Sequence, residues 1–116
     1  MGVEILKYTD SHLLSGSAMN LSFSPSDLKD FKLAQVMVAF GAGVTETVTV
    51  NRDSADGANY DTQLATSDLT AATSYVFRPT GECIFKKGDA VNVTCTNATA
   101  TTTAYVTALL EDKNAS

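Results

Sequence analysis

The stretch from Ser74 to Glu111 reads SYVFRPTGECIFKKGDAVNVTCTNATATTTAYVTALLE and decides the fold class. Three runs that favour β-strands are separated by turn-forming residues, and the stretch ends in an apolar run. In residues 91–95 apolar and polar side chains alternate, as in a strand with one buried face. The pattern predicts an all-β fold, an antiparallel β-sandwich or barrel, and we expect the β-sandwich. Jelly-roll and immunoglobulin-like sandwiches share this strand spacing, so it does not select the strand order.

Upstream of this stretch, the sequence predicts two strands that form a hairpin. Residues 31–40 are apolar on both faces after Gln35, as in a central strand that is covered on both sides. The segment 41–43, Gly-Ala-Gly, is expected to end that strand, and residues 44–50 then alternate along a second strand. Glu46 falls on the inward face of the second strand, so we expect this end of the sandwich to be open to water.

The first thirty residues differ from the rest because serine is frequent and apolar residues are scattered. We interpret residues 1–30 as an extended N-terminal arm, with a short strand near 18–24 and one helical turn at 26–29. Residues 31–116 form the β-sandwich body. The apolar side chains of the arm are the expected assembly contact: Leu13, Leu14, Met19, Leu21 and Phe23.

Length and charge narrow the function classes. The chain has 116 residues, the size of one domain, and 8 basic against 13 acidic residues give a formal net charge of −5. This acidic balance argues against a nucleic-acid partner. No stretch approaches the roughly 18 apolar residues of a membrane helix, and the first twenty residues lack the pattern of a signal peptide. We therefore expect a chain made in the cytoplasm, with no nucleic-acid or membrane partner.

The two cysteines, Cys83 and Cys95, flank the turn at residues 86–89. This spacing allows them to face each other across a hairpin, but a disulfide there would close only a short loop. We expect free, partly buried thiols. Two cysteines and the single histidine, His12, do not make a zinc site, and His12 does not support a nucleophile–histidine triad. The sequence predicts no catalytic site, no cofactor and no metal.

The longest polar segment, residues 51–61, is the candidate binding loop. Turn formation with solvated carboxylates is the favoured interpretation. Calcium binding is an alternative, although the EF-hand spacing fails because Arg52 falls at the first ligand position. A carboxylate pair of a small enzyme, drawn from this loop and Asp68, is another. The candidate residues are Asn51, Asp53, Asp56, Asn59, Tyr60 and Asp61.

Residues 78–93, followed by a threonine-rich bend and residues 105–111, resemble the end of a compact jelly-roll. Together with residues 40–44 and the polar loop, the body from 31 to 111 resembles small auxiliary virion proteins of tailed bacteriophages, of the capsid decoration, cement or head-fibre type. The resemblance implies a jelly-roll-like sandwich that forms homo-oligomers, often trimers, and binds a capsid lattice through an N-terminal arm.

These observations lead to two expectations about function. The first is a non-enzymatic structural protein of the virion, made in the host cytoplasm, that binds and stabilises or decorates a capsid assembly. The alternative is a receptor- or glycan-binding module of a phage fibre or tip, with the loop 51–61 as its site. Tyr60 and Tyr105 are the aromatic residues suited to stacking on a sugar, although packing at the core or rim is the favoured role for each.

Overall fold

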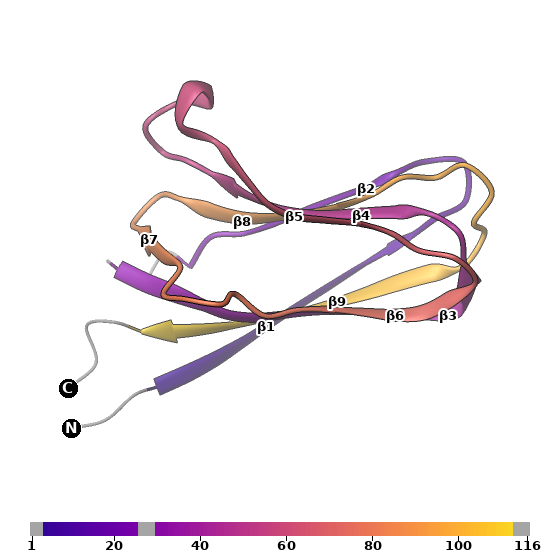
Figure 1. The fold of residues 1–116 in the computed structure, drawn as a ribbon, viewed down its shortest axis with the longest axis horizontal. Coiled ribbons are helices and arrows are strands. Elements are labelled where there is room, and N and C mark those ends of the chain that lie inside the picture. The colour runs from indigo at the N-terminus through magenta and orange to yellow at the C-terminus, as the bar shows by residue number, and fades with distance from the viewer. Residues whose placement is uncertain (1–3, 26–29, 113–116) are drawn as a thin grey trace.

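The computed structural model describes residues 4–25 and 30–112, which form two antiparallel sheets packed face to face (Figure 1). Sheet A has the strand order β1-β9-β3-β6, with β7 paired to β3, and sheet B has the order β2-β8-β4-β5. The strands are β1 (Glu4–Leu13), β2 (Met19–Phe23), β3 (Asp30–Val44), β4 (Thr47–Asp53), β5 (Thr62–Asp68), β6 (Ala72–Phe77), β7 (Ile84–Lys86), β8 (Ala90–Cys95) and β9 (Thr103–Asp112). The predicted β-sandwich is confirmed.

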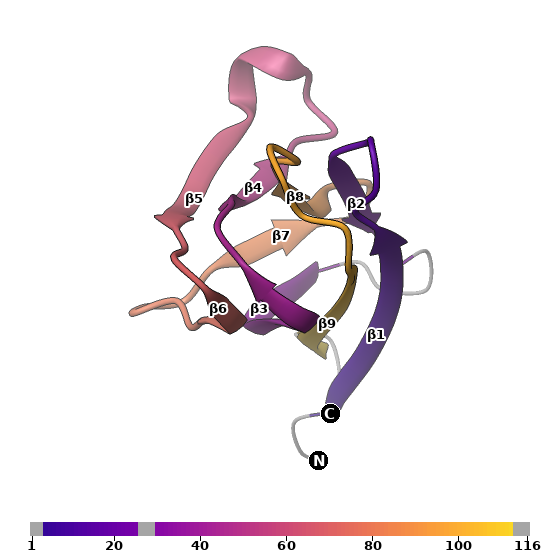
Figure 2. The same cartoon turned by 90° about the vertical axis from the view of Figure 1, so that its right-hand side faces the viewer.

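The N-terminal segment is part of the sandwich, so the division into an arm and a body is corrected. β1 pairs with β9 along its whole length, from Glu4 opposite Asp112 to Leu13 opposite Thr103. β2 pairs with β8 and coincides with the strand expected near residues 18–24. Figure 2 shows β1 along one side of the sandwich, beside β9. The helical turn expected at 26–29 lies outside the described residues.

The expected hairpin between residues 31–40 and 44–50 is wrong. β3 continues to Val44, and the chain then crosses to sheet B, where β4 pairs with β5 and β8. The two glycines do not end β3, because they allow close approach of a side chain at Gly41 and of a backbone segment at Gly43. A Cβ atom on Gly41 would lie 2.6 Å from Thr102 Oγ1, and one on Gly43 would lie 3.3 Å from the carbonyl oxygen of Ala71.

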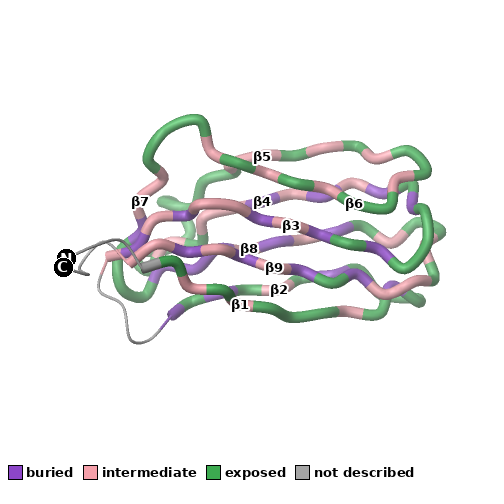
Figure 3. Tube along the Cα trace, turned by 90° about the horizontal axis from the view of Figure 1, so that it is seen from below, coloured by how far each residue is buried: buried purple, intermediate pink, exposed green. Residues whose placement is uncertain are grey.

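The core lies between the two sheets and follows from the alternation along the strands. Figure 3 shows buried positions alternating with more exposed ones on β3, β8 and β9. The largest fully buried side chains are Phe31, Phe85, Leu14, Met19, Leu33, Leu110, Val36, Val38, Val48, Val50, Val91 and Val93. The rings of Phe31 and Phe85 stack with centroids 5.1 Å apart, which closes one end of the core.

The turn at residues 86–89 joins the two sheets and does not form a hairpin. β7 pairs with β3 in sheet A, whereas β8 pairs with β2 and β4 in sheet B. Cys83 and Cys95 therefore do not face each other across a hairpin, and both thiols are free. In the described part of the chain no helix is long and apolar enough to cross a membrane. The short helical turn η1 (Ala58–Tyr60) stands in the loop between β4 and β5.

Candidate functional site

The outer face of sheet B carries a row of polar side chains at one level of all four strands. Ser22 on β2 lies opposite Asn92 on β8, Asn92 lies opposite Asn51 on β4, and Asn51 lies opposite Gln63 on β5. Cross-strand partners point to the same face of a sheet, so the row continues across the sheet from one edge strand to the other. We call Ser22, Asn92, Asn51 and Gln63 the amide row.

Asn92 is the centre of the hydrogen bonds in this row. Its Nδ2 lies 2.6 Å from Asn20 Oδ1, 3.2 Å from the Leu21 carbonyl oxygen and 3.2 Å from Ser22 Oγ. Its Oδ1 accepts a hydrogen bond from Asn51 Nδ2 over 3.2 Å. These contacts hold Asn20 and Asn51 in place, so that part of the surface is preorganised by its own side chains.

A hollow of about 430 Å³ lies over the amide row. It is lined by Asn20, Ser22, Asn51, Arg52, Asp53, Asp61, Thr62, Gln63 and Asn92, and we call it the polar hollow. The loop with η1, which connects the end of β4 to the start of β5, rises from the outer side of sheet B (Figure 1). Ser54 donates its backbone N–H to Asp61 Oδ1 over 2.8 Å, which ties the two ends of this loop together.

The structure brings only some of the residues of the predicted binding loop together. Three of its residues, Asn51, Asp53 and Asp61, line the polar hollow. The other three, Asp56, Asn59 and Tyr60, are exposed and do not line it. The contributions from β2, β8 and the first residues of β5 were not predicted from the sequence. The polar face of each of those strands can be recognised in the sequence, but the register that brings these faces together cannot.

The four carboxylates considered for catalysis do not all come together: Asp53 and Asp61 line the polar hollow, but Asp56 and Asp68 do not. Asp53, Asp56 and Asp61 belong to the β4–β5 region and are exposed, whereas Asp68 ends β5 at the opposite end of that strand. Asp68 Oδ1 accepts a hydrogen bond from Thr47 Oγ1 over 2.7 Å. Within residues 4–25 and 30–112, no three His, Cys, Asp or Glu side chains are grouped as metal ligands.

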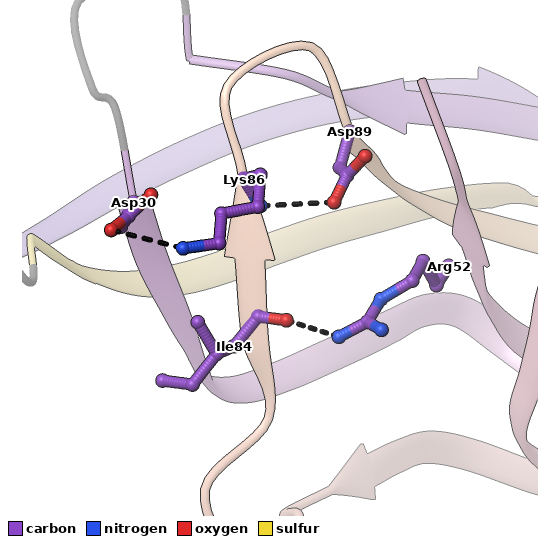
Figure 4. A network of polar contacts seen from close by, with 5 residues as sticks. All are labelled: Asp30, Arg52, Ile84, Lys86 and Asp89. Carbon is purple, nitrogen blue, oxygen red and sulfur yellow. Dashed lines mark hydrogen bonds and ion pairs between the residues drawn. The ribbon is translucent and has the colours of Figure 1, made fainter. Parts of the chain in front are cut away.

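A polar network fixes the end of β4 near the hollow (Figure 4). The Arg52 guanidinium donates from Nη2 to the carbonyl oxygen of Ile84 and lies 4.6 Å from the centroid of the Phe85 ring. Asp89 is buried, and its carboxylate accepts the backbone N–H groups of Ala55 over 2.8 Å and Lys86 over 2.9 Å. The Lys86 ammonium pairs with Asp30 Oδ2 at 3.3 Å. The loop after β4 is thus anchored to the β7–β8 turn.

The outer face of sheet A carries exposed apolar side chains among polar ones, which include Lys7, Thr9 and Ser11 on β1. Register places Tyr105 on β9 opposite Ser11 on β1 and Ala39 on β3, and it places Met37 on β3 opposite Val76 on β6. The exposed or half-buried apolar side chains of this face are Ile5, Leu13, Met37, Val76, Tyr105 and Leu109, and we call them the apolar face. Tyr105 is 55% exposed, so its expected packing at the core or rim is wrong.

The residues expected to form an assembly contact do not share one surface. Leu14, Met19 and Phe23 belong to the core of the same chain, with exposed fractions of 0%, 1% and 6%. Leu21 is half-buried and packs against the core, and Leu13 is exposed on the apolar face. The interpretation of the first three as contact residues is corrected: the pairing of β2 with β8 turns Met19 and Phe23 inward, and Leu14 is buried just after β1, where its N–H bonds to the Thr102 carbonyl oxygen.

No protein-family model matches this chain, and no curated protein matches it.

Proposed function

We propose that the chain is a non-enzymatic structural protein of a virus particle, which binds and stabilises or decorates a capsid assembly. The observation that carries the proposal is the apolar face of sheet A, which continues to β1, a ten-residue strand at the edge of that sheet. Exposed apolar patches on small proteins mark protein–protein contacts. An edge strand offers backbone N–H and C=O groups to a strand of a neighbouring protein.

The strand order supports a jelly-roll as the finer description of the sandwich. The first strand pairs with the last, β2 pairs with β8, and β4 pairs with β5, so the chain pairs as a long hairpin rolled over two sheets. Jelly-rolls occur in viral capsid and lectin domains. This is an argument from fold, and it gives weight to a virion role without naming a partner residue.

In this proposal the N-terminal strand contributes to attachment through Leu13 and the free edge of β1. The buried Leu14, Met19 and Phe23 support the fold instead. The partner is a capsid lattice, the chain is made in the host cytoplasm and resides in the virion, and it forms a homo-oligomer with a trimer as the expected state. Removal of residues 1–24 would delete β1 and β2 together, so single substitutions are the better test.

The test compares two tyrosines of similar exposure. Tyr105 lies on the apolar face and is 55% exposed, whereas Tyr60 lies in the β4–β5 loop and is 65% exposed. Particles of the virus that encodes the chain are prepared without it, and wild-type, Tyr105→Glu and Tyr60→Glu proteins are sedimented with them. We expect wild-type and Tyr60→Glu proteins to sediment with the particles and Tyr105→Glu to stay in solution. If the wild-type protein does not sediment with the particles, the virion role is contradicted. If all three proteins sediment equally, the role of the apolar face in attachment is contradicted.

The oligomeric state is measured separately, by light scattering on the same three proteins. A trimer that persists in Tyr60→Glu and dissociates in Tyr105→Glu would place the contact between subunits on the apolar face too. A trimer that is unaffected by either change would mean that sheet A attaches to the particle only. A monomer at every concentration would contradict the trimer.

A further inference from the structure

The polar hollow on sheet B is made of groups that match the hydrogen bonds of a sugar. Asparagine and glutamine each carry a two-proton donor and an acceptor on one planar group, and a sugar hydroxyl both donates and accepts. Asn20, Asn51, Gln63 and Asn92 all line the hollow, together with the hydroxyl groups of Ser22 and Thr62. Its volume of about 430 Å³ falls within the range of small-molecule sites.

Part of this hydrogen-bonding capacity is free. Asn92 uses its Nδ2 on three neighbouring oxygens and its Oδ1 on Asn51. Asn51 Oδ1 and Asn20 Nδ2 have no hydrogen-bond partner among the described residues, and the same is true of the Gln63 amide. The two asparagine side chains are therefore oriented by Asn92 while each keeps one group for a ligand, which lowers the entropic cost of binding.

The charges around the hollow select against anionic ligands. Arg52 is the one cation among its nine lining residues, and its guanidinium already contacts the Ile84 carbonyl oxygen and the Phe85 ring. Asp53 and Asp61 line the same hollow. Their carboxylates can accept hydrogen bonds from the hydroxyl groups of a ligand, but they repel carboxylates and phosphates. A neutral polyhydroxylated ligand fits this arrangement best.

We propose that the polar hollow binds a neutral glycan, through Asn20, Asn51 and Gln63 from three different strands. This site lies on the outer face of sheet B, whereas the proposed capsid contact lies on the outer face of sheet A (Figure 1). One face can hold the particle while the other meets a carbohydrate at the surface of a cell. The glycan proposal does not rest on the capsid proposal, because no residue belongs to both surfaces.

The experiment uses full-length protein on an array of neutral, sialylated and uronic-acid glycans, followed by calorimetric titration of the neutral glycan that gives the strongest signal. The variants are Gln63→Ala and Asn20→Ala, both at exposed positions of the hollow. The matched control is Gln35→Ala, which removes the chain's other glutamine side chain, on β3 of sheet A. Thermal unfolding of each variant shows that the fold is retained.

We expect a neutral glycan to bind wild-type and Gln35→Ala proteins equally and to bind the two hollow variants about 5- to 10-fold more weakly, the effect of one lost neutral hydrogen bond. Binding of acidic glycans alone would overturn the proposal, and so would an array without neutral hits. A neutral glycan whose affinity is unchanged by both Gln63→Ala and Asn20→Ala would overturn it as well. Particle sedimentation is measured in parallel and is expected to be unaffected by either variant.

Discussion

Glu46 Oε2 accepts a hydrogen bond from the backbone N–H of Thr99 over 2.9 Å. The same carboxylate accepts the N–H groups of Ala98 and Ala100 and the hydroxyl group of Thr96, at distances between 2.8 and 3.0 Å. The side chain is 3% exposed, so the expectation of an end open to water is wrong. Glu46, in the two-residue connection between β3 and β4, thus holds the loop that leads from β8 back to β9.

Replacement of Glu46 with glutamine should destabilise the protein. The amide oxygen can still accept hydrogen bonds, but the amide –NH₂ would face backbone N–H donors that then lose their acceptor. We expect the free energy of unfolding to fall by about 1–3 kcal/mol, measured by urea denaturation. Asp56→Asn, the same chemical change at an exposed position, is the control and should cost less than about 0.5 kcal/mol. Equal stability of Glu46→Gln and wild type would show that the loop does not depend on this carboxylate.

The same carboxylate predicts a loss of stability in acid. Burial raises the pKa of Glu46, but the hydrogen bonds from Ala98, Thr99, Ala100 and Thr96 outweigh burial and lower the pKa from 4.5 to about 2. A folded-state pKa below the unfolded value means that the stabilisation is present above about pH 4.5 and is lost as the pH falls toward about 2. Thermal unfolding of wild type and Glu46→Gln should differ near neutral pH and converge between pH 4.5 and 2. A difference that persists below pH 2 would contradict this assignment.

Most strands of sheet B and the last strand of sheet A could be predicted from the sequence. In each of them apolar and polar residues alternate, because one face of the strand is buried in the core. β8 and β9 have one face in the core, and the pattern along 91–95 and 104–110 records it directly. β2 was expected near residues 18–24 and is found at Met19–Phe23. Such strands can be recognised without knowledge of their partners.

Pairing between distant segments could not be predicted in the same way. Only a few positions of β1 carry apolar side chains, so its sequence shows no clear strand pattern. β1 becomes a strand because β9 offers ten residues of partner backbone. The crossing after Val44 depends on the close approach of Thr102 and Ala71 to two glycines, which resemble a turn in the sequence. The amide row was missed for the same reason, since Ser22, Asn51, Gln63 and Asn92 come together only through register.

Gly88 should be sensitive to substitution, whereas Gly81 should not. Gly88 has φ = +94°, in the left-handed region that favours glycine, and a Cβ atom there would lie 3.0 Å from the Cβ of Ala55. We expect Gly88→Ala to lower the free energy of unfolding by about 1–2 kcal/mol because it strains the turn in which Asp89 N–H bonds to the Lys86 carbonyl oxygen. At Gly81 nothing lies within 4 Å of such a Cβ atom and φ is not in that region.

Gly81→Ala is therefore the matched control, with an expected change of less than about 0.5 kcal/mol. Urea denaturation of both variants and wild type gives the comparison. Hydrogen exchange adds a local readout, because strain at Gly88 should increase exchange at the backbone N–H groups of Ala55 and Lys86, which Asp89 holds. Equal destabilisation by the two substitutions would contradict the role assigned to the turn.

The two thiols should react slowly and in a defined order. Burial, with a contribution from the negative charge of Glu46, raises the pKa of Cys95 to about 11. Burial also raises the pKa of Cys83, while the positive charge of Arg52 acts against that rise. At pH 8 roughly one Cys95 side chain in a thousand is a thiolate, which is the nucleophilic form. Cys83 is only half-buried, so iodoacetamide should label it first.

The labelling is followed by mass spectrometry of the native protein under non-reducing conditions. Cys83→Ser should remove the faster modification, and Cys95→Ala should leave it unchanged, because the two residues lie on different sides of the β7–β8 connection. Labelling of Cys95 before Cys83 would show that the core around β8 opens more readily than the segment before β7. Protein that accepts no label until it is reduced would show a disulfide between the two residues. The disulfide would require β7 to leave β3, since the pairing with β3 keeps β7 in sheet A, apart from β8.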